Sequence, residues 1–180
     1  MIVFDASGSM ALAHRGQVKI ETARQAVGAV LPDITELRKT GLVTYAGCSR
    51  IELRVPPAFG SAPDIIAKLA TTRARGDTPL TRAVSVAHAA LRKAGETGVV
   101  VLVTDGLESC SDSPCRFGRL AGRRAPGIAV HVIGFALGPR HAIDELRCLA
   151  DATGGTFVEV SDLDRLRNKL RELLGCPMLS

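Results

Sequence analysis

Three short segments of the chain place oxygen-bearing side chains beside apolar runs. Asp5-Ala6-Ser7-Gly8-Ser9 follows the first apolar run and offers one carboxylate and two hydroxyls at alternate positions. Asp77-Thr78-Pro79-Leu80 supplies a threonine hydroxyl, and the aliphatic run 99–103, followed by Thr104, leads into Asp105-Gly106. Carboxylate and other oxygen ligands hold hard divalent cations such as Mg²⁺. If the three loops meet, Asp5, Ser7, Ser9, Thr78 and Asp105 form an open metal site.

Strands and helices alternate along the chain and would position these side chains. Several strand candidates are continuous aliphatic runs, which are typical of strands covered on both faces. Between them, apolar residues recur at helical spacing, first over residues 20–30 before Pro32 and last from Leu163 onward. The strand candidates are residues 1–5, 41–46, 51–55, 98–104, 128–135 and 156–160.

The pattern predicts an α/β fold with a doubly wound, mostly parallel sheet. Only the segment 41–55 has hairpin spacing, because a short loop, Gly47-Cys48-Ser49-Arg50, separates its two strands. The remaining units are typical of right-handed βαβ connections, with helices on both faces of the sheet. In such sheets, sites form beyond the carboxyl ends of the strands, where Asp5 and Asp105 lie.

Length and composition indicate a single globular domain spanning residues 1–180. Hydrophobic residues make up 46% of the chain and aromatic residues only 3%, so the core must be aliphatic. Only four residues precede Asp5, which is short for a central strand, so we expect a piece of a longer protein. No signal peptide and no apolar run long enough for a membrane span is recognised.

The net charge of +5 raises the question of nucleic-acid binding. The arginines are spread along the sequence, Arg123-Arg124 is the only tight pair, and no aromatic residues are interleaved to stack on bases. A solvated basic surface is the better interpretation, and we expect no nucleic-acid partner.

Five cysteines bear on the compartment of the protein. Their spacing matches no zinc motif, and an oxidising compartment would allow two disulfides with one cysteine left over. Cys176 is the natural unpaired one, and the other four allow three pairings between which the spacing does not choose. The four disulfide candidates are Cys48, Cys110, Cys115 and Cys148.

The three oxygen-bearing segments together resemble the metal-ion-dependent adhesion site of von Willebrand factor A domains. Asp5-Ala6-Ser7-Gly8-Ser9 matches the DxSxS element of that family, Thr78 its metal-site threonine, and Asp105-Gly106 its third element. The order of strands and helices also agrees over essentially the whole chain. The resemblance implies a six-stranded sheet of order 3-2-1-4-5-6 in which strand 3 is antiparallel.

The resemblance also implies roles for the five residues. Ser7, Ser9 and Thr78 would contact Mg²⁺, with Ca²⁺ or Mn²⁺ as alternatives, whereas Asp5 and Asp105 would act largely through bound water. Neutral hydroxyl ligands leave the cation electrophilic, so an open position could accept a Glu or Asp carboxylate from a protein partner. The implied function is a non-enzymatic, adhesion-type binding module.

The loop after Asp105 is similar to a cysteine-containing loop of bacterial members that work outside the cytoplasm. This likeness supports an extracytoplasmic location, periplasmic, secreted or at the cell surface, and makes the four candidate cysteines the disulfide set. Asp77 and Glu108 are candidates for the ligand-binding rim, although Asp77 as a helix cap and Glu108 as a solvated loop charge are equally simple interpretations.

Two alternatives belong to other functional classes. A Mg²⁺-dependent phosphohydrolase of the haloacid dehalogenase type also begins with a strand that ends in Asp, but its second Asp is replaced here by Ser7. A scaffold domain within a larger assembly would make no use of a metal.

Overall fold

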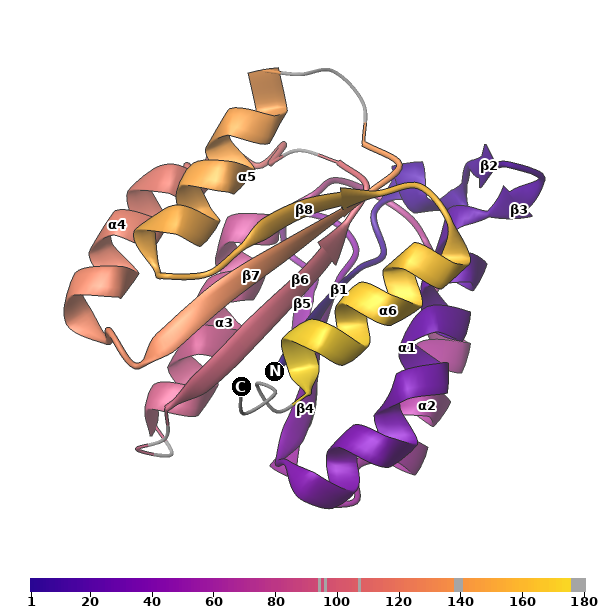
Figure 1. Ribbon diagram of the computed structural model, residues 1–180. Coiled ribbons are helices and arrows are strands. Elements are labelled where there is room, and N and C mark those ends of the chain that lie inside the picture. Colours follow the sequence, from indigo (N-terminus) through magenta and orange to yellow (C-terminus); the bar gives the residue numbers. More distant parts are fainter. Residues whose placement is uncertain (94, 96, 107, 138–140, 176–180) are drawn as a thin grey trace.

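A computed structural model describes residues 1–93, 95, 97–106, 108–137 and 141–175 (Figure 1). Six strands form one central sheet, and helices cover both of its faces. The six strands are β1 (Ile2–Asp5), β4 (Thr40–Tyr45), β5 (Ile51–Ala58), β6 (Gly98–Thr104), β7 (Ile128–Phe135) and β8 (Phe157–Val160).

The order of strands across the sheet is β5-β4-β1-β6-β7-β8. Strand β5 runs antiparallel to β4, and every other neighbouring pair is parallel. This topology confirms the predicted doubly wound α/β fold, including the hairpin and its edge strand. It also sets β1 beside β6, so that two of the oxygen-bearing loops leave the sheet side by side.

Helices pack on both faces of the sheet in two layers (Figure 1). Alternate residues of β1 serve the two layers, since Phe4 packs in one core cluster and Val3 in the other. One layer holds α1 (Lys19–Leu37), α2 (Ala62–Thr71) and α6 (Leu163–Leu174), and the other holds α3 (Leu80–Lys93), α4 (Pro114–Arg124) and α5 (His141–Ala152).

The first helix is longer than its sequence pattern predicts. Helix α1 continues through Pro32 to Leu37, although proline lacks the N–H that the helix needs at that point. The Pro32 side chain is exposed, while Ile34 and Thr35 beyond it are buried. Burial of the last turn therefore offsets the lost hydrogen bond. The short helix η1 (Gly8–Ala11) and the ribbon of β2 (Ala13–His14) with β3 (Gln17–Val18) were not predicted.

The described part of the chain contains two disulfides, one between the loops that follow β4 and β6 and one between helices α4 and α5. Cys48 pairs with Cys110, and Cys115 pairs with Cys148. All four cysteines were candidates, and the structure supplies the pairing that the sequence left open. Cys176, the predicted unpaired cysteine, lies outside the described residues. In the described part of the chain, no helix has the length and apolar character needed to cross a membrane.

Candidate metal centre

The candidate site lies where β1 and β6 end. These strands are parallel neighbours, with Phe4 opposite Val103, so their carboxyl ends meet at one edge of the sheet. Asp5 is the last residue of β1, and Asp105 directly follows β6. Both carboxylates are buried, with exposed fractions of 0% and 4%. Buried carboxylates require hydrogen bonds or cations, and the surrounding loops supply them.

Asp5 is held by hydrogen bonds to both of its oxygens. The backbone N–H of Ser7 donates to Oδ1 at 2.7 Å, and the Thr104 hydroxyl donates to Oδ2 at 2.6 Å. Burial raises the pKa of Asp5 above its usual range, and these two hydrogen bonds partly offset that rise. The carboxylate is therefore fixed in orientation.

A second chain of contacts links Ser7 to Asp105. The hydroxyls of Ser7 and Ser9 lie 3.1 Å apart, and the Ser9 hydroxyl donates to Oδ1 of Asp105 at 2.7 Å. The ammonium of Lys19, the first residue of α1, donates to Oδ2 of Asp105 at 2.7 Å. The Lys19 side chain is only 12% exposed, so this is a largely buried ion pair. The sequence analysis missed Lys19, because no motif links it to the site.

The Thr78 loop is tied by its backbone to both neighbouring loops. The N–H of Gly8 donates to the carbonyl of Gly76 at 2.8 Å, and the N–H of Gly47 donates to that of Asp77 at 2.9 Å. Gly76 has a φ of +72°, and a Cβ there would lie 3.1 Å from the Gly47 Cα. Only glycine allows this backbone conformation and this close approach without strain.

The hydroxyls of Ser9 and Thr78 face the same small space beside Gly106. A Cβ on Gly106 would lie 3.6 Å from Ser9 Oγ and 3.9 Å from Thr78 Oγ1. Glycine thus leaves room next to both oxygens. The five predicted residues come together at this edge, from the loops that follow β1 and β6 and from the loop before α3.

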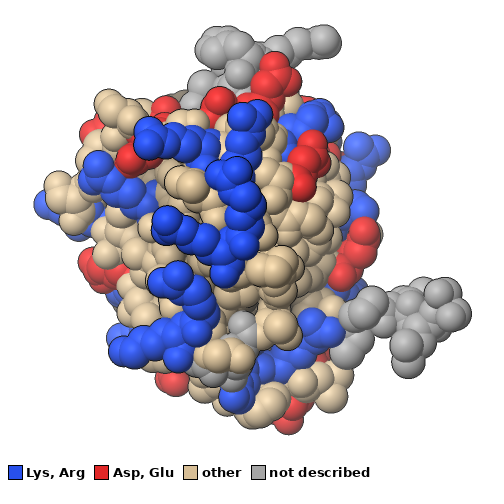
Figure 2. All heavy atoms as spheres, turned by 90° about the vertical axis from the view of Figure 1, so that its left-hand side faces the viewer, with Lys and Arg blue, Asp and Glu red and all other residues tan. Residues whose placement is uncertain are grey.

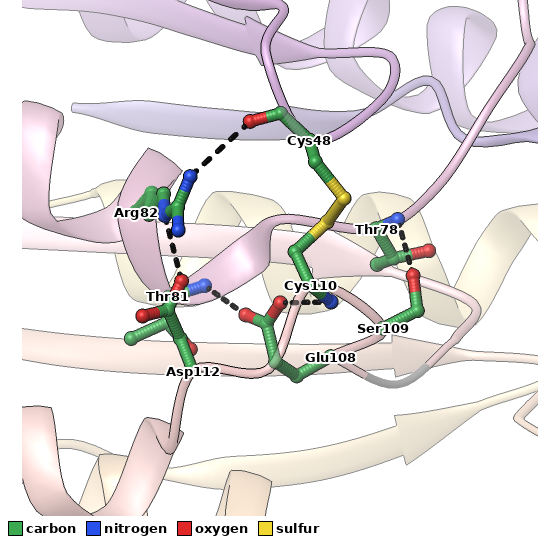
Figure 3. Close-up of a disulfide and its surroundings, with 8 residues drawn as sticks. All are labelled: Cys48, Thr78, Thr81, Arg82, Glu108, Ser109, Cys110 and Asp112. Atoms are coloured by element: carbon green, nitrogen blue, oxygen red, sulfur yellow. Dashed lines mark hydrogen bonds and ion pairs between the residues drawn. A yellow bond between two sulfur atoms is a disulfide. The ribbon is translucent and has the colours of Figure 1, made fainter.

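The two predicted rim residues have different environments. Asp77 is exposed at the edge. Glu108 is committed to the backbone, since its Oε2 accepts from the N–H of Thr81 at 2.8 Å and its Oε1 from that of Cys110 at 2.9 Å (Figure 3). Glu108 therefore caps the start of α3. Its negative charge also interacts favourably with the positive end of the helix dipole.

Ser109 is a further residue that the sequence analysis missed. Its hydroxyl accepts from the N–H of Thr78 at 2.8 Å, and its own N–H donates to the Thr78 carbonyl at 3.1 Å (Figure 3). Cys110, which directly follows Ser109, is joined to Cys48 by a disulfide. The loop after β6 thus holds Thr78 in place from a position that only the fold reveals.

The donor set fits a hard divalent cation. All of its donor atoms are oxygens, carried by three hydroxyls and two buried carboxylates. Within the described ranges, no three His, Cys, Asp or Glu side chains lie close enough to hold a metal. A metal at this edge would therefore depend on the serine and threonine hydroxyls, because the Lys19 ammonium already pairs with one of the two carboxylates.

Several solved structures share the fold of this chain. An aerotolerance-related membrane protein from Bacteroides fragilis aligns with a TM-score of 0.76 at 15% identity, covering 96% of both chains. A von Willebrand factor type A protein from Catenulispora acidiphila aligns with a TM-score of 0.75 at 22% identity, covering 96% of this chain and 41% of that one. Proximal thread matrix protein 1 from the mussel byssus, with zinc in its MIDAS motif, aligns with a TM-score of 0.68 at 20% identity, covering 96% and 43%.

These likenesses establish the fold, and a match to a family model shows that the sequence also belongs to a known family. No curated protein matches the chain. The model for the von Willebrand factor type A domain matches residues 1–108, which include all three oxygen-bearing segments. More than half of the sequence thus fits the family whose fold the structure displays, and the chain belongs to the von Willebrand factor type A domain family.

Proposed function

We propose that this domain is a metal-dependent protein-binding module. Ser7, Ser9 and Thr78 would hold Mg²⁺ through their hydroxyls, and a Glu or Asp carboxylate of a protein partner would complete the coordination shell. The observation that carries the proposal is the convergence of Ser9 and Thr78 on the space beside Gly106, next to Asp105.

The carboxylates of Asp5 and Asp105 would act indirectly, by positioning the residues whose hydroxyls hold the metal and by supplying negative charge. Asp5 keeps both of its oxygens in hydrogen bonds to Ser7 and Thr104, so it supplies negative charge and holds the Ser7 backbone. Asp105 orients the Ser9 hydroxyl by accepting a hydrogen bond from it. A cation held mainly by neutral hydroxyls keeps most of its charge and therefore attracts an incoming carboxylate.

Lys19 makes the site selective about its occupant. Its ammonium neutralises Asp105, so a divalent cation must either displace Lys19 from Oδ2 or bind with reduced attraction from that carboxylate. With Lys19 in place, the charge at the site is more positive once the metal has bound. This arrangement favours capture of an anionic partner group over tight retention of the metal.

The family supports the general class of this function. Von Willebrand factor A domains generally serve as protein-interaction modules rather than enzymes, and they often bind a divalent metal at the MIDAS. The paired cysteines favour an oxidising, extracytoplasmic location, because disulfides persist in such compartments.

Metal titration tests the proposal directly. Mg²⁺ at about 100 times its Kd should stabilise the wild-type domain by ~2.7 kcal/mol, because only the folded state holds the ion. The Thr78→Ala variant should lose most of this gain. Ser49→Ala, in an exposed loop, should keep it. Equal responses of Thr78→Ala and the wild type would contradict the proposed site.

The open position has its own test. Mn²⁺ bound to the domain should enhance the relaxation of water protons, and added acetate should reduce this enhancement by replacing bound water. No effect of acetate would contradict carboxylate capture.

Hydrolysis of a phosphate ester with Mg²⁺ that is lost in Asp5→Asn would favour the phosphohydrolase instead.

A further inference from the structure

Arginines that are scattered in the sequence gather on one face of the folded domain. Figure 2 shows the side of the molecule that carries α4, where Lys and Arg side chains run across the centre of the view. Of the exposed arginines on α3 and α4, five form no ion pair with a carboxylate in the described part of the chain. They are Arg92, Arg116, Arg119, Arg123 and Arg124.

The stability of α4 does not account for this charge. Arg116, Arg119 and Arg123 follow one another at helical spacings of three and four, where like charges repel. Arg116 also lies in the first turn, at the positive end of the helix dipole. Arg123 and Arg124 suit the last turn, but the stripe as a whole costs the helix stability.

Carboxylates near these arginines are already engaged. Asp112 accepts from Arg82 at 2.7 Å, so Arg82 is neutralised. Glu145 of α5 accepts from the hydroxyl of Ser113 and the backbone N–H of Cys115, both at 3.1 Å. The positive charge of the α4 face therefore remains available to a partner.

A groove with an apolar floor runs between α3 and α4, alongside these arginines. Two adjoining hollows of about 410 and 320 Å³ share Phe117 and Leu120 in their lining. Leu120 is 38% exposed, and the Phe117 ring packs edge-on against His88 at 5.9 Å between centroids. Arg116 lines one hollow, and Arg92 and Arg124 line the other, so guanidinium groups border the floor.

We propose that this groove binds an acidic amphipathic helix of a protein partner. The apolar stripe of such a helix would cover Phe117 and Leu120, and its Glu or Asp side chains would pair with Arg92, Arg116 and Arg124. Helix α4 has 11 residues and therefore offers ~16 Å of groove, which matches about three turns of a partner helix.

Other anionic partners fit the groove less well. A phosphate backbone would use the guanidinium groups but would leave the exposed Leu120 uncovered, and the one aromatic ring of the floor is already packed on His88. A membrane surface would meet arginines around a recessed floor rather than a protruding apolar group. The combination of apolar floor and arginine border is complementary to an amphipathic acidic helix.

This inference is independent of the proposed metal site, because no groove residue is a proposed metal ligand. The test uses a fluorescent peptide of about 18 residues, with Leu at helical spacing and Glu on both flanks, in buffer containing EDTA. Fluorescence anisotropy should show saturable binding that weakens as salt rises. A peptide with Gln in place of every Glu should bind much more weakly.

Matched variants locate the binding surface. Arg116→Gln with Arg124→Gln should weaken peptide binding by about tenfold, whereas Arg165→Gln with Arg171→Gln, on α6 across the sheet, should change it by less than about twofold. Likewise Leu120→Ser should weaken binding, and Ile66→Ser, a similarly exposed site on α2, should not. Circular dichroism confirms that each variant is folded.

Three outcomes would overturn the inference. One is the absence of saturable peptide binding at about 100 µM protein, which is the range of weak specific contacts. Another is equal weakening by the groove variants and their α6 or α2 controls. The third is tighter, arginine-dependent binding of a duplex oligonucleotide or of phosphatidylserine vesicles, which would assign the face to another class of partner.

Discussion

At the scale of single residues, the pair of Lys19 and Asp105 is the most consequential feature of the site. The Lys19 ammonium forms an ion pair with Asp105, the carboxylate that would otherwise support a metal ion. Both side chains are largely buried, so neither can rely on water for its stability. Either Lys19 or a bound cation can therefore neutralise the buried charge of Asp105.

Substitution of Lys19 by Met should expose this competition. Without metal, Lys19→Met leaves Asp105 buried and unpaired, so the free energy of unfolding should fall by about 3 kcal/mol. Mg²⁺ should then restore more stability than it adds to the wild type, since it replaces the lost positive charge. Urea unfolding with and without Mg²⁺ measures both effects.

A surface lysine provides the control for this experiment. Lys68→Met, at an exposed position of α2, should change neither the stability nor the response to Mg²⁺. If Lys19→Met responded to Mg²⁺ no more than the wild type does, the metal would not bind beside Asp105.

The sequence predicts some features of the site and not others. DxSxS, Thr78 and Asp105-Gly106 are recognisable, because the chemistry of each lies in a short motif. Lys19 and Ser109 are not, since each acts through a contact made across the fold, with Asp105 and Thr78 respectively. Glu108 is predicted at the ligand-binding rim, but both of its carboxylate oxygens accept hydrogen bonds from backbone N–H groups. No local sequence pattern indicates this role.

At the scale of elements, the Cys48–Cys110 disulfide joins two of the loops that meet at the site. It connects the hairpin loop after β4 to the segment that holds Thr78 through Ser109 (Figure 3). The bridge closes a span of 62 residues, which predicts ~4 kcal/mol of stabilisation from chain entropy alone. Its second effect should be to hold Thr78 in position for a metal.

The two disulfides form a natural matched pair for testing this effect. Cys115→Ala with Cys148→Ala removes a bridge across 33 residues, between α4 and α5, and should also cost ~4 kcal/mol. Cys48→Ala with Cys110→Ala should lower stability similarly but also raise the Kd for Mg²⁺. Calorimetric titration below the melting range of both variants separates the two effects, and equal Kd values would contradict the role assigned to the Cys48 bridge.

The strands and their mostly parallel pairing could be predicted because buried parallel strands leave a strong sequence signal, whereas their order across the sheet came from the family resemblance. Continuous aliphatic runs mark β6 and β7, and the short loop between β4 and β5 requires an antiparallel pair. The end of α1 could not be predicted, since burial of Ile34 outweighs a local helix breaker. The two-residue strands β2 and β3 are too short to show any periodicity.

At the scale of the whole molecule, the two helical layers differ in surface charge. Four arginines lie on α4, where helical spacings of three and four turn Arg116, Arg119 and Arg123 to one side. The opposite layer of α1, α2 and α6 holds ion pairs such as Lys169 with Glu172 and Arg167 with Asp164. Net charge alone could not have distinguished these two faces.

Two histidines link the stability of the whole fold to pH. Burial lowers the pKa of His88 and that of His131, with Arg92 adding to the effect at His88. His131 also accepts a hydrogen bond from the N–H of Thr156 at 3.0 Å through Nδ1, which protonation would abolish. Both rings are therefore held neutral in the folded state.

The sign of the resulting pH dependence follows from proton uptake. In the unfolded chain each histidine titrates near its usual pKa of ~6.5, so below that pH the unfolded state binds more protons than the folded state. This contribution to stability is intact above pH ~6.5 and is lost as pH falls toward the lowered pKa values. The raised pKa of Asp5 acts in the opposite direction, so the slope of the wild type alone is not diagnostic.

Comparison with His88→Gln isolates the histidine contribution. Glutamine cannot take up a proton, so the loss of stability between about pH 7.5 and 5.5 should be smaller in the variant than in the wild type. Urea midpoints across this range give the two slopes, and the contribution of Asp5 cancels in their difference. Identical slopes would mean that the ring of His88 accepts a proton in the folded state as readily as in the unfolded chain, contrary to its burial on α3 against Phe117 of α4.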